Sequence, residues 1–142
     1  MAEKRILVAY DETELSEKAL QMGIDFVRGD SEAILEVAYV APIPNLAIED
    51  LEKYADLIDM LTEDCRDVLY KAQSEMEGIE GRYETLMVKG SDPAAELLKL
   101  AAQKQYYLII IGSRGLSGIK EYIGSVSHKV LHGADVPVLI VK

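Results

Sequence analysis

The residues best suited to chemistry in this sequence lie in a glycine-rich segment near its C-terminal end. Residues 108–111 form an apolar run typical of a buried strand, and a loop follows it directly. The loop contains four glycines and ends at a serine that opens a helix-like pattern: Gly112, Gly115, Gly118, Gly124 and Ser125. Glycine lets the backbone approach an anion closely, and free N–H groups at a helix start point toward it. The segment therefore favours a phosphate-binding loop.

Particular groups of this loop are predicted to hold the phosphate. Gly115, Gly124 and Ser125 would donate backbone N–H groups, Ser125 also a hydroxyl, and Arg114 and Lys120 would neutralise charge. The spacing matches neither GxxxxGK[ST] nor GxGxxG, so the loop is neither an NTPase loop nor a dinucleotide fingerprint. An ordinary surface loop with turn glycines is the alternative, and the residues alone leave both interpretations open.

The rest of the chain alternates short apolar runs with amphipathic helical patterns. Strands are predicted at residues 6–10, 33–40, 82–88, 107–111 and 136–141. Helices are predicted from Thr13 or Ser16 to Gly29, over residues 48–76, after the N-cap Asp92, and over residues 125–134. Such alternation indicates a parallel sheet with helices on both faces. We expect one α/β domain over residues 1–142: a doubly wound, Rossmann-like three-layer sandwich with a five-stranded parallel sheet of order 3-2-1-4-5 and four helices.

This strand order places a ligand crevice between the first and fourth strands. Ligands of open α/β sheets bind beyond the carboxyl ends of the strands, where the winding reverses. Asp11 follows the first strand and Gly112 the fourth, so we expect them to face each other. The turn from Asp11 to Thr13 is acidic and lacks glycine, so it would repel a phosphate. Any phosphate is therefore expected at the loop after the fourth strand. Asp11 itself has two interpretations, orienting a ribose or capping the first helix.

Composition and charge exclude several classes of function. The chain has 15 basic and 25 acidic residues, a net charge of −10, which argues against a nucleic-acid partner. Apolar runs fall short of the ~18 residues that span a membrane, so we expect no membrane partner. The single cysteine, Cys65, excludes an internal disulfide and suits a reducing compartment. We therefore expect a cytosolic protein.

Other reactive residues favour structural roles. His128 and His132 have a spacing that a metal accepts on a helix. However, they lie opposite the apolar face of that helix and no third ligand is evident, so no metal site is predicted. Cys65 belongs to the apolar stripe of the long helix, and Ser127 is predicted to satisfy a backbone group. The acidic residues of that long helix form a solvated face or, alternatively, a partner surface.

Motifs at both ends of the chain resemble the universal stress protein family. GSRGLSGIKEYIGSVSHKVL followed by VPVLIVK resembles the family's C-terminal signature, and ILVAYDETELSEKAL resembles its first strand and helix. The resemblance extends over essentially the whole chain. It implies that Asp11 contacts the ribose or adenine side of a nucleotide and that the backbone of Val40 meets the adenine. It also implies that Gly112, Gly115, Gly124 and Ser125 hold the phosphates, with Mg²⁺ as a possible companion ion.

One departure from the family pattern keeps two functions open. The nucleotide-binding branch has nine residues between its second and third glycines, whereas eight separate Gly115 from Gly124 here. The resemblance implies a regulatory protein that binds ATP or another adenine nucleotide in the stress response. The shorter loop supports the alternative, a protein-interaction module that binds no nucleotide. An enzyme is least favoured, with slow ATP hydrolysis at most, because we find no placed general base and no Walker lysine.

The last strand predicts a self-association surface. Val138–Val141 is apolar and β-branched, and the expected order puts it at the sheet edge, where Pro137 at its start is tolerated. A bare apolar edge needs a cover, and the same strand of a second copy is the simplest one. The family resemblance also points to a homodimer. We therefore expect a homodimer through this strand.

Overall fold

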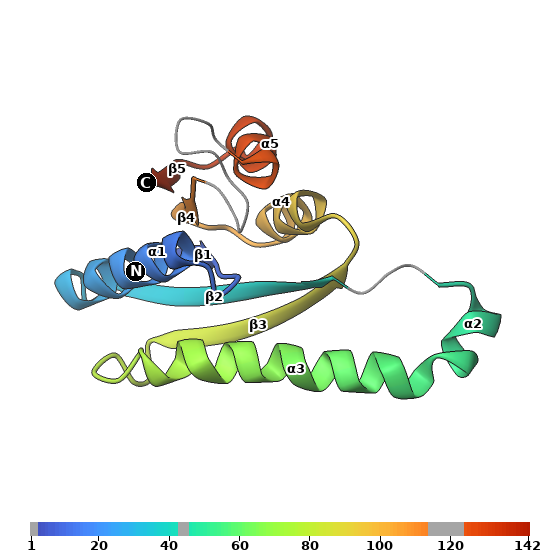
Figure 1. The fold of residues 1–142 in the computed structure, drawn as a ribbon. Helices are drawn as coiled ribbons and strands as arrows, with labels where there is room; N and C mark the ends of the chain where they lie inside the picture. Colours follow the sequence, from blue (N-terminus) through green and yellow to red (C-terminus); the bar gives the residue numbers. More distant parts are fainter. Residues whose placement is uncertain (1–2, 43–45, 114–123) are drawn as a thin grey trace.

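The computed structural model describes residues 3–42, 46–113 and 124–142. These residues form five strands and five helices, with one helix in each connection between strands except β2–β3, which has two (Figure 1). Their bounds are β1 Lys4–Ala9, α1 Glu14–Gly29, β2 Ala33–Pro42, α2 Ile48–Lys53, α3 Ala55–Ser74, β3 Tyr83–Gly90, α4 Pro93–Gln103, β4 Leu108–Gly112, α5 Ser125–Gly133 and β5 Val138–Val141. Among these helices, none is both long and apolar enough to cross a membrane.

The strands form one parallel sheet of order β3-β2-β1-β4-β5, which confirms the predicted order. The winding reverses between β1 and β4, because β2 and β3 extend the sheet on one side and β4 and β5 on the other. Parallel strands are joined by crossovers of one hand, so α1 and α3 cover one face while α4 and α5 cover the other. Figure 1 shows α3 running along β3, with α4 and α5 on the far side.

Two apolar cores hold the layers together. The first packs β1 and β2 residues such as Val8 and Leu35 against α1 and the C-terminal half of α3. The second packs Leu7, Ala38 and Ile109 against α4 and α5. Successive strand residues therefore alternate between the two cores, as side chains on a pleated strand must. The strands at the reversal are buried on both faces, which fixes the position of the edge where their carboxyl ends meet.

The single helix predicted over residues 48–76 is two helices. The chain leaves helical conformation at Tyr54, where φ is −109° and ψ is 19°, and α3 ends at Ser74. Neither α2 nor α3 has a side-chain hydrogen bond at its N-cap. The apolar residues keep steps of three or four across the break, so the periodicity conceals it. No residue of α2 is buried, and a helix without packing has little to hold it in line with its neighbour.

Candidate functional site

The candidate site lies where the β1–β4 ladder ends. The last residue pair in register is Val8 with Ile110. In a continued ladder the Asp11 N–H would donate to the Gly112 carbonyl. Instead the Asp11 N–H donates to Ser16 Oγ at 3.2 Å, and the Gly112 carbonyl accepts from Ser127 Oγ at 2.5 Å. Two serine hydroxyls thus replace one ladder bond, and the strands part at the switch point. The prediction that Ser127 satisfies a backbone group is confirmed.

Asp11 is exposed at this edge and organises the turn into α1. Its Oδ1 accepts from the Thr13 N–H at 3.1 Å and from the Thr13 hydroxyl. Thr13 in turn is the N-cap, and its Oγ1 accepts from the Ser16 N–H at 3.3 Å. Asp11 therefore does not cap α1 itself but holds the residue that does. Its Oδ2 makes no hydrogen bond to another described residue and remains available to a ligand.

Gly112 is required by the packing of α1. A Cβ at this position would lie 2.9 Å from the Leu15 Cβ and 3.2 Å from the Leu15 carbonyl carbon. Side chains do not tolerate approaches that short, so only glycine lets the first turn of α1 lie against the end of β4. The sequence pattern assigned this glycine to an anion. In the structure its missing side chain brings the β1–α1 turn, which carries Asp11, up to the end of β4.

The start of α5 offers donors at the same edge. Gly124 is the N-cap, and its N–H donates to the Ser113 carbonyl at 2.5 Å, which ties the helix start to the end of β4. The Gly124 N–H is therefore already engaged, although the sequence assigned it to a phosphate. No side chain caps this helix. The N–H groups of Ser125 to Ser127 have no intrahelical acceptor, since the first such bond in α5 runs from His128 to Gly124.

Val40 lies across the crevice near the end of β2. β1 pairs with β2 only as far as Ala9 opposite Ala38, and the Tyr10 N–H donates to the Ala38 carbonyl at 2.9 Å. Backbone groups alternate sides along a strand, so Val40 directs its N–H and C=O to the side that Ala38 uses. β1 has ended there. Val40 thus directs one donor and one acceptor into the space beyond β1, a pair suited to the edge of a planar base.

Arg114 and Gly115, together with Gly118 and Lys120, lie outside the described residues. The structure brings the ends of β1, β4 and β2 and the start of α5 to one edge, which unites Asp11, Gly112, Val40, Gly124 and Ser125 there.

Cys65 and the two histidines of α5 lie on the faces that the sequence pattern predicted for them. Cys65 is buried at 6% exposure. His128 and His132 lie on the exposed side of α5, where their ring centroids are 4.3 Å apart. Within residues 3–42, 46–113 and 124–142, no three His, Cys, Asp or Glu side chains are grouped to hold a metal ion.

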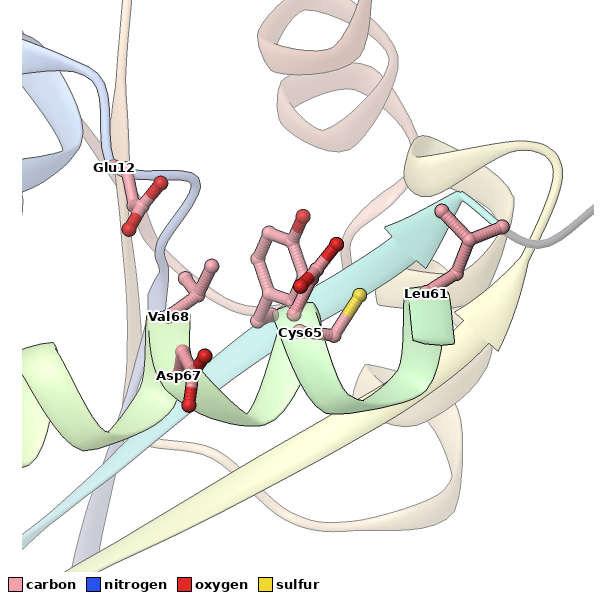
Figure 2. A pocket seen from close by; sticks show the side chains of 7 residues that line it. Glu12, Leu61, Cys65, Asp67 and Val68 are labelled. Carbon is pink, nitrogen blue, oxygen red and sulfur yellow. The ribbon is translucent and has the colours of Figure 1, made fainter. Parts of the chain in front are cut away.

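A pocket of about 330 Å³ lies beside the crevice, between α3 and the end of β2 (Figure 2). Its lining includes three carboxylates, Glu12 of the β1–α1 turn and Asp64 and Asp67 of α3, together with Tyr39 and Cys65. Burial, followed by the neighbouring Cys65, raises the pKa of Tyr39 to about 12, so its hydroxyl stays protonated. Carboxylates repel phosphate at this side. An anion is therefore directed to the α5 side of the crevice.

A pair of carboxyl groups lies behind the β1–α1 turn. The hydroxyl of Tyr10, the residue before Asp11, donates to Glu17 on α1, and burial and this bond raise the pKa of Tyr10. Glu75 follows α3, and its buried Oε2 has no hydrogen-bond partner among the described residues. Burial, followed by the adjacent Glu17, raises the pKa of Glu75 to about 7. Below that pH the carboxyl group of Glu75 therefore holds its proton in the folded chain, beside Glu17 of α1.

Sequence reasoning missed one buried ion network. Glu36 on β2 is fully buried, and its carboxylate accepts from Lys104 Nζ at 2.8 Å, the Tyr106 hydroxyl at 2.9 Å and Arg5 Nη1 at 3.4 Å. Lys104 and Tyr106 precede β4, so the network lies toward the amino ends of the strands, away from the crevice. The available signal was one acidic residue inside the apolar run of β2. The network is structural, because each carboxylate oxygen is already paired.

Comparison with known proteins identifies the family of the chain. Residues 3–142 match the model of the universal stress protein family. The chain belongs to the universal stress protein family. The universal stress protein YxiE of Bacillus subtilis is 31% identical over 147 residues, which cover 97% of this chain and 98% of YxiE.

Solved structures of universal stress proteins share the fold. MJ0577 of Methanocaldococcus jannaschii is 29% identical with a TM-score of 0.82, covering 100% of this chain and 97% of that one. A universal stress protein from Archaeoglobus fulgidus, solved in complex with dAMP, is 23% identical with a TM-score of 0.70 and covers 100% of both chains.

Proposed function

We propose that this universal stress protein is a regulatory protein that binds ATP or a related adenine nucleotide between β1 and β4. The observation that carries the proposal is the end of the β1–β4 ladder. There Asp11 and Gly112 turn their backbone groups to Ser16 and Ser127, and the strands part. The uncapped start of α5 lies at the same edge. A crevice at a switch point with free helix-start amides is suited to a phosphorylated ligand.

The nucleotide would lie with its base toward β2 and its phosphates toward α5. Val40 offers a backbone donor and acceptor to the adenine edge, and Asp11 Oδ2 is an acceptor for a ribose hydroxyl. Ser125 and the two residues after it offer N–H groups to the phosphates. Arg114 and Gly115 would complete the phosphate end, and Mg²⁺ would be held by the phosphates and the Ser125 hydroxyl. The three carboxylates of the neighbouring pocket favour this direction over the reverse.

The ligand class is supported by a relative. The Archaeoglobus fulgidus protein was solved with dAMP, an adenine nucleotide, and its chain has the same fold. We propose binding rather than catalysis, with slow hydrolysis at most. Asp11, the acidic residue at this edge, is engaged with Thr13 through Oδ1, and a general base would need to be placed beside the attacking water.

Calorimetric titration with ATP, ADP, AMP and GTP tests the proposal. We expect adenine nucleotides to bind more tightly than GTP. Ser125 is the first residue of α5, a position where proline is well tolerated. Proline there removes both the N–H group and the hydroxyl, whereas alanine removes the hydroxyl alone. Ser125→Pro should weaken the binding of ATP by about tenfold while leaving the affinity for adenosine unchanged. Ser125→Ala is the control that keeps the N–H group. Absence of heat with every nucleotide, or equal affinity of ATP for wild type and Ser125→Pro, would contradict the proposal.

We also propose that the nucleotide state is signalled through a homodimer formed by β5. β5 ends the strand order, and Val138, Leu139 and Ile140 are half-buried there. The Ser113 N–H donates to the Val141 carbonyl, so by alternation Ile140 directs its N–H away from β4. Ile140→Pro should therefore give a monomer by sedimentation equilibrium, with Ile140→Ala as the control for side-chain loss. A monomeric wild type at micromolar concentration would remove this proposal.

A further inference from the structure

The two helices that follow β2, α2 and α3, extend past the sheet on which the C-terminal half of α3 packs. In α3 the buried residues are Cys65, Val68, Leu69 and Ala72, all in its C-terminal half. Figure 1 shows α2 and the first turns of α3 extending beyond the ends of β2 and β3. We call residues 48–64 the arm. The apolar stripe that packs on the sheet continues into the arm through Leu61 and Ile58, which are only half-buried, and exposed apolar side chains lie beside it.

The arm exposes large apolar side chains. Leu51 is 43% exposed, Leu57 47% and Met60 55%, and Ile48 at the start of α2 is more exposed still. Within the arm, none of the described residues is buried. Single exposed apolar residues are ordinary, but several of them on two consecutive short helical stretches are typical of a surface that binds a partner.

The charge of the arm restricts what that partner can be. The arm contains seven acidic residues and one lysine, a net charge of −6 out of −10 for the chain. The acidic residues are Glu49, Asp50, Glu52, Asp56, Asp59, Glu63 and Asp64. A second arm carries the same charge and is repelled, and so are nucleic acid and an anionic membrane surface. An apolar surface surrounded by carboxylates is complementary to an apolar surface surrounded by lysine or arginine.

We propose that the arm is the docking surface for a basic amphipathic helix of another protein. As one straight helix the arm would span about 25 Å at about 1.5 Å per residue. The break at Tyr54 shortens this, so the surface matches roughly four turns of a partner helix. Leucine-like residues of the partner would cover Leu51 and Leu57, and its lysine or arginine residues would face the carboxylates. The inference goes beyond nucleotide binding and does not depend on it, because Leu51 and Leu57 line neither the β1–β4 crevice nor the pocket beside it.

A defined peptide tests this surface. The probe is a fluorescent amphipathic helix of about 18 leucine and lysine residues, with a scrambled sequence and a leucine–glutamate version as control peptides. Measured by fluorescence anisotropy, only the basic amphipathic peptide should bind, and its affinity should fall as the salt concentration is raised. The double variant L51S/L57S should lower the affinity for this peptide by at least about tenfold.

A matched variant distinguishes the arm from apolar exposure in general. Phe26 on α1 is 41% exposed and lies outside the arm, so Phe26→Ser should leave the peptide affinity unchanged. Circular dichroism checks that each variant keeps its fold. Equal loss in Phe26→Ser and L51S/L57S would overturn the proposal, and so would binding of the scrambled peptide. Self-association that L51S/L57S abolishes in sedimentation would also overturn it, because the occupant would then be a second copy.

Discussion

Replacing Glu75 with glutamine should remove part of the pH dependence of folding stability. Burial and Glu17 raise the pKa of Glu75 from 4.5 to about 7 in the folded chain. The folded state therefore holds a proton between pH 4.5 and 7 that the unfolded state has released. Ionising Glu75 in the folded chain lowers the free energy of unfolding. This loss of stability is absent below pH 4.5, grows as the pH rises, and is complete above pH 7. Glutamine keeps an N–H donor for Glu17 at every pH, so the variant does not incur it.

The magnitude follows from the pKa difference. At about 1.4 kcal/mol per pKa unit, the full difference corresponds to about 3 kcal/mol. Glu75 is only partly buried, so solvent screening reduces the expected effect to about 1–2 kcal/mol. Wild type and Glu75→Gln should be equally stable near pH 4.5, and the variant should be more stable by this amount at pH 8.

Urea denaturation across this pH range provides the measurement. Glu77→Gln is the matched control, because Glu77 is exposed and lies two residues away, so the variant removes one charge without touching Glu17. Its pH profile should match the wild type. Parallel profiles for wild type and Glu75→Gln would refute the reasoning, and so would an equal change in Glu77→Gln, which would assign the effect to net charge.

Two further substitutions test the packing of the sheet. Tyr106→Phe removes a hydrogen bond to the buried carboxylate of Glu36 and should cost about 2 kcal/mol in urea denaturation; an unchanged midpoint would show that the network contributes little. Gly112→Ala should destabilise the fold by about 1–3 kcal/mol in the same urea assay, because the new Cβ would lie 2.9 Å from the Leu15 Cβ. Gly29→Ala, whose new Cβ has no neighbouring atom within 4 Å, should be neutral.

Local patterns predicted the layers, the strand order and several caps. Apolar runs separated by amphipathic helices indicate a doubly wound sheet, and the face that each helix covers follows from the handedness of the crossovers. Asp92 was predicted to be an N-cap from its position before Pro93. In the structure its side chain accepts from the Ala95 N–H at 3.3 Å, as an N-cap does. Ser127 was recognisable in the same way, since a serine at a helix start has few roles other than bonding to backbone.

Contacts between distant segments were beyond the reach of these patterns. The break at Tyr54 depends on the lack of a surface beneath α2, and the apolar steps continue through it. Gly112 is required by Leu15, which lies nearly a hundred residues earlier in the chain. The Phe26 side chain shares a helical face with buried residues yet is 41% exposed, because the sheet covers a narrower arc of α1 than the pattern suggests. Packing decides each case, and packing is not encoded in spacing.

The central claim is that an adenine nucleotide occupies the edge between β1 and β4. Amide chemical shifts, recorded by two-dimensional ¹⁵N NMR during titration with ATP, test it most directly. We predict that the largest changes fall on Asp11, Val40 and the first residues of α5, with little change along the arm. Unchanged spectra at millimolar ATP, or changes confined to α2 and α3, would contradict the account.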